Sequence, residues 1–203
     1  MPELPDVESF KSYFDATSLH QKIHNVQVLN RKILWNISPH TLKRKLKGKA
    51  FLSTYRHGKY LFAKVNTNLW IVLHFGMTGY LKYFKNAEKD HHHYRLLFCF
   101  NNGFHLAYVC QRLLGKVTMV GTIDEFIKEN KIGPDALDID LKTFQNNFIG
   151  LRGAIKPILM NQKFIAGIGN IYSDEALFDA GIHPLRKANE LSNEELKKLF
   201  NSI

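Results

Sequence analysis

Cysteine and long apolar runs are the scarcest features of this chain. Only two of its 203 residues are cysteines, Cys99 and Cys110, and they form no C-x-x-C pair. A disulfide framework and a zinc site of the usual spacing are thereby excluded, and we expect two reduced thiols in or near the core. Because no run of about 18 apolar residues occurs, we also expect no membrane-spanning helix.

A signal peptide is missing as well. Glu3, Asp6 and Glu8 occupy positions where such a segment would need a basic and then an apolar stretch. Internal repeats and low-complexity segments do not occur either. These absences favour a globular, cytoplasmic protein.

Negative charge is outnumbered by positive charge. The chain has 28 Lys and Arg against 18 Asp and Glu, a formal net charge of +10. Proteins this basic commonly bind polyanions such as nucleic acid, although a merely soluble basic surface is the alternative. The basic clusters, at 43–49 and at Arg152, Lys156 and Lys163, are spread along the chain. This spread predicts a groove lined from several segments rather than a basic tail.

The first two thirds of the chain have a helix and then a strand pattern. After Pro5, which suits a first helical turn, Val7, Phe10 and Phe14 recur at helical spacing and predict a helix over 5–19. Stretches rich in β-branched and aromatic residues follow, with a hairpin signal at Asn102–Gly103. Many short strands indicate a sandwich or a barrel. The predicted strands are 24–29, 33–37, 50–56, 59–66, 69–74, 79–84, 94–100 and 104–109.

The last third reads as helical. Thr122 and Glu125 form a capping box for a short helix, and Gly133–Pro134 then breaks the pattern. We therefore predict an α+β chain of two domains, 1–133 and 134–203. The predicted helices of the second domain are 141–148, 152–161, 170–180 and one beginning at Ser192. The last apolar stripe still runs at Ile203 without a C-cap, so we expect a truncated or incomplete chain.

The N-terminus carries the first candidate for chemistry. Met1 precedes Pro2, a residue that commonly permits removal of the initiator methionine. Removal would expose a secondary amine beside Glu3, and an α-amino group titrates near ~8 against about 10.4 for lysine. A helix N-terminus should further disfavour an ammonium there. Such an amine can attack a sugar carbon while Glu3 handles protons, although many chains begin Met-Pro merely as a helix lead-in.

Two glycine-containing segments and two lysines are candidates for nucleic-acid contact. The segment 74–79, His-Phe-Gly-Met-Thr-Gly, would expose Met77 at a loop tip, where it could wedge into a base stack. The alternative is a core methionine under a turn. The segment 167–172 places two glycines and Asn170 at a helix start suited to phosphate, or forms a tight helix–helix turn. Lys156, four residues after Arg152 on a preceding predicted helix, adds cationic partners on one face, and Lys59 could meet phosphate or be a solvated strand residue.

Three adjacent histidines, at 91–93, suggest a metal site only superficially. Neighbouring residues of a strand point to opposite faces, so three in a row rarely ligate one ion. We favour a loop or sheet-edge role for them and predict no metal site.

In their order along the chain, these motifs resemble those of the formamidopyrimidine-DNA glycosylase and endonuclease VIII family. The opening P-E-L-P-D-V-E of residues 2–8 is similar to the family's P-E-L-P-E-V-E and less similar to the P-E-G-P-E start of endonuclease VIII. A lysine before a strand, H-x-G-M-(S/T)-G, G-x-G-N-I-Y and the G-I-H-P of residues 181–184 follow. Five ordered matches spanning 1–203 are hard to obtain by chance.

The resemblance implies a fold, an activity and roles for individual residues. The family fold is a β-sandwich followed by a helix–two-turn–helix domain. The implied activity is bifunctional glycosylase and abasic-site lyase chemistry on oxidised bases in duplex DNA, by a monomeric bacterial protein of the nucleoid, without a cofactor. Pro2 would be the nucleophile and Glu3 the general acid and base. The residues implied to contact DNA are Lys59, His74, Met77, Arg112, Lys156, Asn170 and Tyr172.

Three departures from the family pattern affect these expectations. The family's D-P-R-R-F-G reads Cys110-Gln111-Arg112-Leu113-Leu114-Gly115, so that leucine replaces a phenylalanine wedge beside the arginine that pairs with the orphaned base. Asp6 replaces a glutamate. The cysteines of the family's C-terminal zinc finger are absent, and weak DNA binding is one expected consequence.

Two other readings remain open at this point. The departures around Arg112 would suit a protein that keeps the fold and binds damaged DNA without turnover, and a retained Met1 would support that reading. Alternatively, the chain is an RNA- or ribosome-associated module, because helix–two-turn–helix segments also occur there. The Pro2–Glu3 start would then have no explanation.

Overall fold

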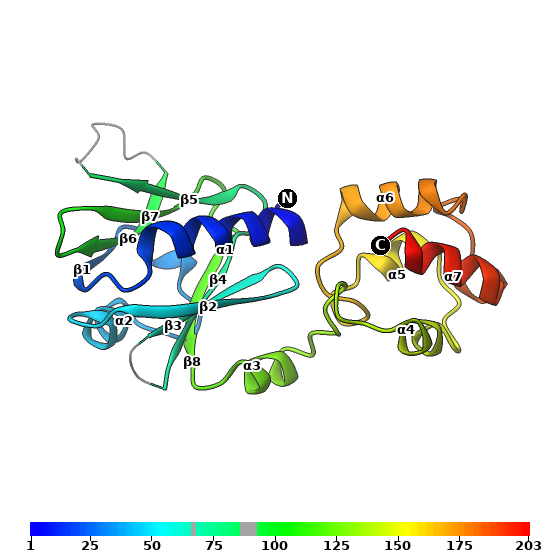
Figure 1. Cartoon of the computed structure of the whole chain (residues 1–203), viewed down its shortest axis with the longest axis horizontal. Coiled ribbons are helices and arrows are strands. Elements are labelled where there is room, and N and C mark those ends of the chain that lie inside the picture. Colours follow the sequence, from blue (N-terminus) through cyan, green and yellow to red (C-terminus); the bar gives the residue numbers. More distant parts are fainter. Residues whose placement is uncertain (66–67, 86–92) are drawn as a thin grey trace. The chain divides into compact units, whose positions relative to one another are not determined.

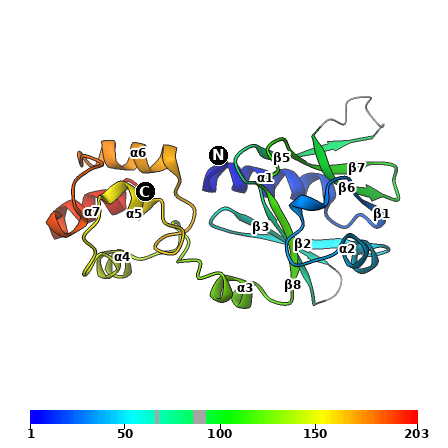
Figure 2. The ribbon, with the colours of Figure 1, turned by 180° about the vertical axis from the view of Figure 1, so that it is seen from behind.

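The computed structural model describes residues 1–65, 68–85 and 93–203. The chain forms two compact units, Met1–Phe126 and Ile127–Ile203, shown from two sides in Figures 1 and 2. The predicted domain boundary, 133–134, lies a few residues after the division between these units at 126–127. Of the three adjacent histidines, His91 and His92 fall outside the described residues.

The first unit is a sandwich of two antiparallel four-stranded sheets with α1 (Leu4–Ser18) beside it (Figure 1). One sheet has the order β1-β6-β7-β5 and the other β2-β3-β4-β8. This architecture confirms the predicted α+β class. The strands are β1 (Ile23–Val28), β2 (Phe51–His57), β3 (Tyr60–Val65), β4 (Trp70–His74), β5 (Gly79–Phe84), β6 (Tyr94–Phe100), β7 (His105–Cys110) and β8 (Lys116–Val120).

Aromatic side chains join α1 to the two sheets. Phe14 of α1 and Phe51 of β2 are fully buried, with ring centroids 5.0 Å apart, and Phe51 lies 5.4 Å from Phe98 of β6. Each edge-to-face pair of this kind adds to the free energy gained by burying apolar area. At the other end of β2 the Arg56 Nε lies 2.8 Å from a carboxylate oxygen of Glu8. The helix is therefore held along the length of β2.

The strand predicted at 33–37 is wrong. A short 3-10 helix, η1 (Arg31–Ile33), is followed by Asn36 at φ 54°, a left-handed conformation that interrupts regular strand geometry. The apolar residues that suggested a strand are instead anchors of a turn, since Ile33 is fully buried.

Two elements of the sandwich were not predicted. Helix α2 (Pro39–Leu46) begins with Ser38, whose hydroxyl accepts the Thr41 N–H at 3.1 Å, and it buries Leu42 and Leu46. Strand β8 pairs with β4 over its whole length. The Ser-Pro start of α2 is a recognisable helix signal, whereas β8 is fixed by pairing with a strand distant in sequence.

The second unit is helical. Its apolar side chains converge on Phe144, Leu159, Leu177 and Leu199, all almost fully buried. Its helices are α4 (Leu141–Asn147), α5 (Ile155–Leu159), α6 (Asn170–Asp179), η2 (Ala188–Glu190) and α7 (Asn193–Asn201), and α3 (Ile123–Glu129) lies at the junction of the units. The predicted helix over 152–161 is shortened to α5.

The end of α7 differs from its prediction. The helix was expected to continue through the last residue, but it ends at Asn201. The Ser202 hydroxyl donates to the Asp179 carboxylate at 2.7 Å, which ties this segment to the end of α6. The predicted start at Ser192 is confirmed, because Ser192 caps the helix and bonds reciprocally with Glu195 at 3.2 and 2.8 Å.

Candidate active site and nucleic-acid interface

The start of α1 fixes the residue that follows Pro2. Glu3 is the N-cap of the helix, its backbone N–H donates to the Asp6 carboxylate at 2.8 Å, and its side chain is only 1% exposed. Asp6, which replaces the family's glutamate, is therefore still long enough to accept the hydrogen bond from the Glu3 N–H. Because Glu3 directly follows Pro2 in the chain, its buried carboxylate is a candidate to exchange protons with groups bound at the Pro2 nitrogen.

Lys59 lies in the tight turn between β2 and β3, next to Gly58 at φ 53°. Its side chain is 4% exposed, and burial lowers the pKa of its ammonium while the Glu3 carboxylate opposes that shift. The turn therefore brings a buried cation within electrostatic reach of Glu3, from a part of the sequence more than fifty residues away. Desolvated charges of this kind interact more strongly than charges in water.

His74 ends β4 and belongs to the same electrostatic cluster. Its Nδ1 accepts the Gly76 N–H at 3.3 Å, and its ring lies 4.9 Å from that of Tyr60. Burial, and then the charges of Lys59 and Lys116, lower the pKa of His74 to about 4. The ring is therefore neutral at pH 7, and its proton lies on Nε2 because Nδ1 is an acceptor.

The loop that carries Met77 packs against the loop that carries Arg112. Gly76 has φ 61°, and a Cβ added there would lie 2.5 Å from the backbone carbon of Leu114. Phe75, on the same loop, also places its ring 4.6 Å from Phe10 of α1. Both loops are thereby joined to the helix that begins at Glu3.

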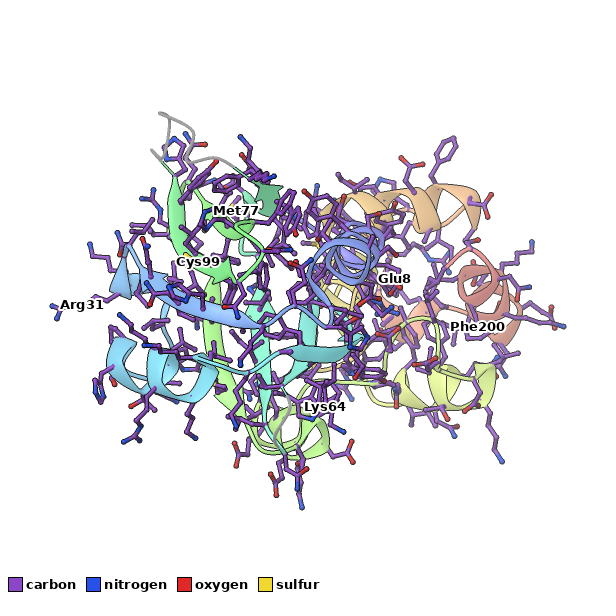
Figure 3. All side chains as sticks on the ribbon, turned by 60° about the vertical axis from the view of Figure 1, so that its left-hand side comes forward. Glu8, Arg31, Lys64, Met77, Cys99 and Phe200 are labelled. Carbon is purple, nitrogen blue, oxygen red and sulfur yellow. The ribbon has the colours of Figure 1, made fainter. Side chains whose placement is uncertain are left out.

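The tips of these two loops are exposed. Met77, labelled in Figure 3, is 41% exposed, Leu114 is 49% exposed, and Arg112 is exposed as well. Large apolar side chains can enter a base stack, and an arginine beside them can face an unpaired base. The geometry thus accommodates the roles expected of Met77 and Arg112, with Leu114 at the position of the family's phenylalanine.

The loop of Arg112 is held by residues that the sequence did not single out. Arg95 of β6 donates from Nε to the Cys110 carbonyl at 2.8 Å and from Nη2 to the Gln111 carbonyl at 3.3 Å. The Gly115 N–H donates to the Cys110 sulfur at 3.4 Å. Sulfur is a weak acceptor, so the cysteine at the position of the family's aspartate closes this loop with a weak bond.

In the second unit the segment before α6 forms a turn closed by Gln162. The Gln162 Nε2 donates to the carbonyls of Met160 and Ile168, both at 2.8 Å, and its Oε1 accepts the Gly167 N–H at 3.0 Å. Gly167 has φ 115°, a conformation that favours glycine. A single side chain therefore shapes the approach to the helix. Sequence reasoning missed Gln162, because its role lies in bonds to backbone groups.

Asn170 and Tyr172 lie at the start of α6. Asn170 is the first residue of the helix and is exposed, and Tyr172 is 43% exposed. The first N–H groups of a helix point out of its end and favour an anion there. The turn shaped by Gln162 thus ends in an arrangement that suits a phosphate.

Lys156 is engaged within its own unit. Its Nζ lies 2.7 Å from the carboxylate of Asp174, so that the ion pair joins α5 to α6. Arg152 precedes α5 and does not share a helical face with Lys156, contrary to the prediction of a helix over 152–161. A phosphate that approached Lys156 would compete with Asp174.

The residues present do not fit the zinc ion that the family's finger implies. Cys99 and Cys110 are free, buried thiols on β6 and β7. The part of the chain that the structure describes contains no group of three His, Cys, Asp or Glu that could hold a metal ion. Within the same residues no helix is long and apolar enough to cross a membrane.

Comparison with known proteins agrees with this geometry. Residues 1–117 match the formamidopyrimidine-DNA glycosylase N-terminal domain, and residues 132–203 match the formamidopyrimidine-DNA glycosylase H2TH domain. A formamidopyrimidine-DNA glycosylase of Moorella thermoacetica is 34% identical over 207 residues, which cover 100% of this chain and 76% of the relative. That of Carboxydothermus hydrogenoformans is 35% identical, with 100% and 74% covered.

Solved structures extend the likeness to three dimensions. A complex of Lactococcus lactis Fpg with DNA that contains an abasic site has a TM-score of 0.93 at 29% identity, covering 98% of this chain and 74% of that one. A complex of the same protein with THF-DNA and an inhibitor has a TM-score of 0.94, covering 99% and 76%. Both sequence and fold therefore lead to one assignment: the chain belongs to the formamidopyrimidine-DNA glycosylase family.

Proposed function

We propose that this protein is a DNA glycosylase and abasic-site lyase that excises oxidised purines, of the 8-oxoguanine and formamidopyrimidine type, from duplex DNA. The observation that carries the proposal is that Glu3, which follows Pro2 in the chain, and Lys59 are both almost fully buried and lie within electrostatic reach of each other. The names of the relatives and the damaged-DNA complexes of the Lactococcus protein support it.

Pro2 is the proposed nucleophile. Once Met1 is removed, its nitrogen is a secondary amine at the entrance to α1, and it forms a bond to C1′ of the damaged nucleotide. The glycosidic bond breaks, and its electron pair leaves with the base, which takes up a proton. The amine then loses its own proton, and Glu3 is the group beside it that accepts protons.

Strand cleavage follows from an iminium. The nitrogen lone pair forms a double bond to C1′ while the bond from C1′ to O4′ breaks, and Glu3 delivers a proton to O4′. Loss of a C2′ proton then expels the 3′ phosphate, and a second elimination expels the 5′ phosphate. Glu3 serves the proton transfers at the amine and at O4′, water supplies the proton of the departing base and accepts the proton from C2′, and no metal or organic cofactor takes part in the proposed sequence.

The remaining site residues hold the DNA in this proposal. Lys59 and the Nε2–H of neutral His74 bind phosphates near the lesion, and Asn170 and Tyr172 bind phosphate at the start of α6. In the other loops Met77 fills the space left by the extruded nucleotide, and Arg112 faces the orphaned base. Lys156 also binds a phosphate, which replaces the Asp174 carboxylate as the partner of its ammonium.

Borohydride trapping tests the proposal. Protein whose first residue is verified as Pro2 by intact mass is mixed with duplex that contains 8-oxoguanine or an abasic site, and the iminium is reduced to a stable adduct. We expect a covalent complex with both duplexes and none when an extra residue precedes Pro2. Lack of an adduct with verified protein, or an equal yield from the extended protein, would contradict Pro2 as the nucleophile.

A non-catalytic damage binder is the second candidate. It is favoured by the loop of Arg112, where Cys110, Gln111 and Leu114 depart from the family pattern. Intact mass decides between the two, because a retained Met1 leaves the Pro2 nitrogen in a peptide bond. Binding of abasic-site DNA without trapping or cleavage would support the binder.

We also propose that the protein works as a monomer, without a cofactor, in the bacterial cytoplasm on nucleoid DNA. Its relatives are bacterial proteins, and the proposed chemistry requires only protein groups. Light scattering of purified protein and elemental analysis for zinc test the first two statements, and fluorescence microscopy of a C-terminally tagged chain tests the third.

A further inference from the structure

A dense group of cations lies on the outside of the sandwich. It consists of six exposed side chains from η1, α2 and the residue after α2, and we call it the distal basic surface. No aspartate or glutamate occurs between residues 16 and 87, so the local sequence supplies no counter-charge. The six residues are Arg31, Lys32, Lys43, Arg44, Lys45 and Lys47.

Helix α2, which together with Lys47 supplies four of the six cations, lies at the far end of the first unit from the candidate active site. Helix α1 runs from Glu3, near Lys59, to Ser18, and Leu19 pairs with Phe51 at the start of β2. Strand β2 returns to the turn of Lys59 over seven residues, or about 20 Å. Since β2 begins shortly after α2 ends, the two sites are separated by its length. Figures 1 and 2 show α2 at the end of the sandwich away from the N-terminus.

None of the six cations makes an ion pair or a side-chain hydrogen bond with any residue that the structure describes. Arg31, labelled in Figure 3, points away from the ribbon. One or two basic residues in the last turn of α2 complement its dipole, but like charges crowded on one short helix repel. Bound anions would relieve this repulsion.

The surface fits a nucleic acid better than a lipid bilayer. A helix that lies on a membrane must offer apolar side chains beside its cations. In α2 those side chains, Leu42 and Leu46, are 0% exposed in the core of the sandwich. What remains outward is charge, which matches the regular phosphate backbone of a duplex.

We propose that the distal basic surface is a second binding site for duplex DNA, which contacts phosphates without reading bases or lesions. It goes beyond the excision site and holds a second segment of DNA while the first is searched or processed. Its contribution is purely electrostatic, so binding there weakens steeply with salt.

Charge-neutral variants test the proposal against a matched control. The triple variant Lys43→Gln, Arg44→Gln, Lys47→Gln removes three charges from the surface. The control Lys142→Gln, Lys197→Gln, Lys198→Gln removes three exposed charges from the second unit. Binding of lesion-free duplex is measured by fluorescence anisotropy over a range of salt. We expect the slope of log K against log salt to fall by about 2 to 3 for the first triple, at about 0.9 per phosphate contact, and to stay unchanged in the control.

Stoichiometry and excision separate the two sites. At low salt we expect the wild type to bind two short duplexes of about one helical turn (~10 base pairs) and the first triple to bind one. Excision from a short lesion duplex should be equal in both. Equal slopes for the two triples, one duplex per wild-type chain, or slower excision in the first triple would each overturn the proposal. So would loss of binding to phosphatidylglycerol vesicles with unchanged duplex binding, which would assign the surface to membranes.

Discussion

The two units of this protein differ sharply in charge. Residues 1–126 contain 18 Lys and Arg against 8 Asp and Glu, whereas residues 127–203 contain 10 of each kind. The whole net charge of +10 therefore resides in the sandwich. Under the proposed function, long-range attraction of DNA comes from the first unit, and the helical unit binds phosphate through local geometry, such as the N–H groups at the start of α6.

The candidate residues of the two units differ in burial as well. Glu3 and Lys59 are almost fully buried, and the Glu3 carboxylate opposes the lowering of the Lys59 pKa by burial, whereas Asn170 and Tyr172 are exposed at a helix end. Burial strengthens electrostatic effects and tunes protonation, as chemistry requires. Exposure suits groups that only dock the backbone of DNA. In the proposed function, therefore, the first unit carries out the chemistry and the second positions the DNA.

The largest effect expected from this division is at Glu3. The substitution Glu3→Gln keeps the shape of the side chain and the backbone bond to Asp6 but removes the proton-transferring group. We expect single-turnover excision to slow by about a hundredfold to ten-thousandfold, the usual contribution of general acid–base catalysis. Rapid-quench measurement on 8-oxoguanine duplex checks this.

The control for Glu3 is the exposed Glu129→Gln, which loses the same charge in the second unit. It should excise at the wild-type rate. If Glu3→Gln retained that rate as well, the sandwich would not hold the proton-transferring group, and the division between the units would fail.

The second effect is a pH dependence that belongs to the first unit. His74 has a pKa of about 4 in the folded protein against 6.5 in an unfolded chain. As the pH falls below 6.5 the unfolded chain takes up the proton first, so stability is lost until the folded ring protonates near pH 4. The gap corresponds to about 3 kcal/mol at 1.36 kcal/mol per pH unit.

Urea unfolding at pH 7 and at pH 4 measures this loss. In His74→Gln the decrease in free energy of unfolding should be smaller than in the wild type by about 3 kcal/mol. The control His24→Gln alters an exposed histidine of β1. Its free energy of unfolding should decrease between pH 7 and pH 4 by as much as that of the wild type. Identical pH dependence in His74→Gln and wild type would rule out a His74 ring that stays neutral down to about pH 4.

The third effect tests the packing of the two loops. Gly76→Ala places a Cβ 2.5 Å from the Leu114 backbone at a positive φ, whereas Gly48→Ala meets a positive φ with nothing within 4 Å. In thermal unfolding, Gly48→Ala should lower the free energy of unfolding by about 1 kcal/mol because of backbone strain. Gly76→Ala should lower it by that amount plus a further ~1–3 kcal/mol, because overpacking adds to the strain. Equal losses at both glycines would mean that the loops of Met77 and Arg112 are not in contact.

Much of the fold was predictable because local signals agreed with tertiary structure. Pro5 and the apolar spacing after it marked α1, and Asn102–Gly103 marked the β6–β7 hairpin, where Gly103 has φ 83°. The apolar stretch 33–37 failed, because burial of Ile33 in a turn and burial in a strand leave the same residue pattern. Strand β8 was missed since its partner β4 is more than forty residues away.

The candidate site was predictable only as a set of residues. The motifs pointed to Pro2 and Glu3, but nothing in the sequence shows that Lys59 lies beside Glu3 or that Lys156 is paired with Asp174. Hydrogen bonds from a side chain to distant backbone carbonyls, such as those of Arg95, also leave no periodic trace. These features arise only when separate elements of the chain meet.

The smallest effect concerns the second unit, where Gln162 shapes the turn before α6. In Gln162→Glu a carboxylate replaces the amide that donates to Met160 and Ile168, so oxygen faces two carbonyls. We expect the Kd for abasic-site duplex to rise about tenfold, equivalent to ~1.4 kcal/mol, with the excision rate at saturating DNA unchanged.

Gln145→Glu is the matched control for Gln162, because it alters a glutamine of the same unit that makes one exposed bond of 3.3 Å to the Asn193 carbonyl. Its Kd should stay within twofold of the wild type, well below the tenfold change expected at Gln162. A fall in the saturated excision rate of Gln162→Glu with unchanged Kd would show that this turn acts on the chemistry. Positioning and chemistry would then not be divided between the two units as their burial and charge indicate.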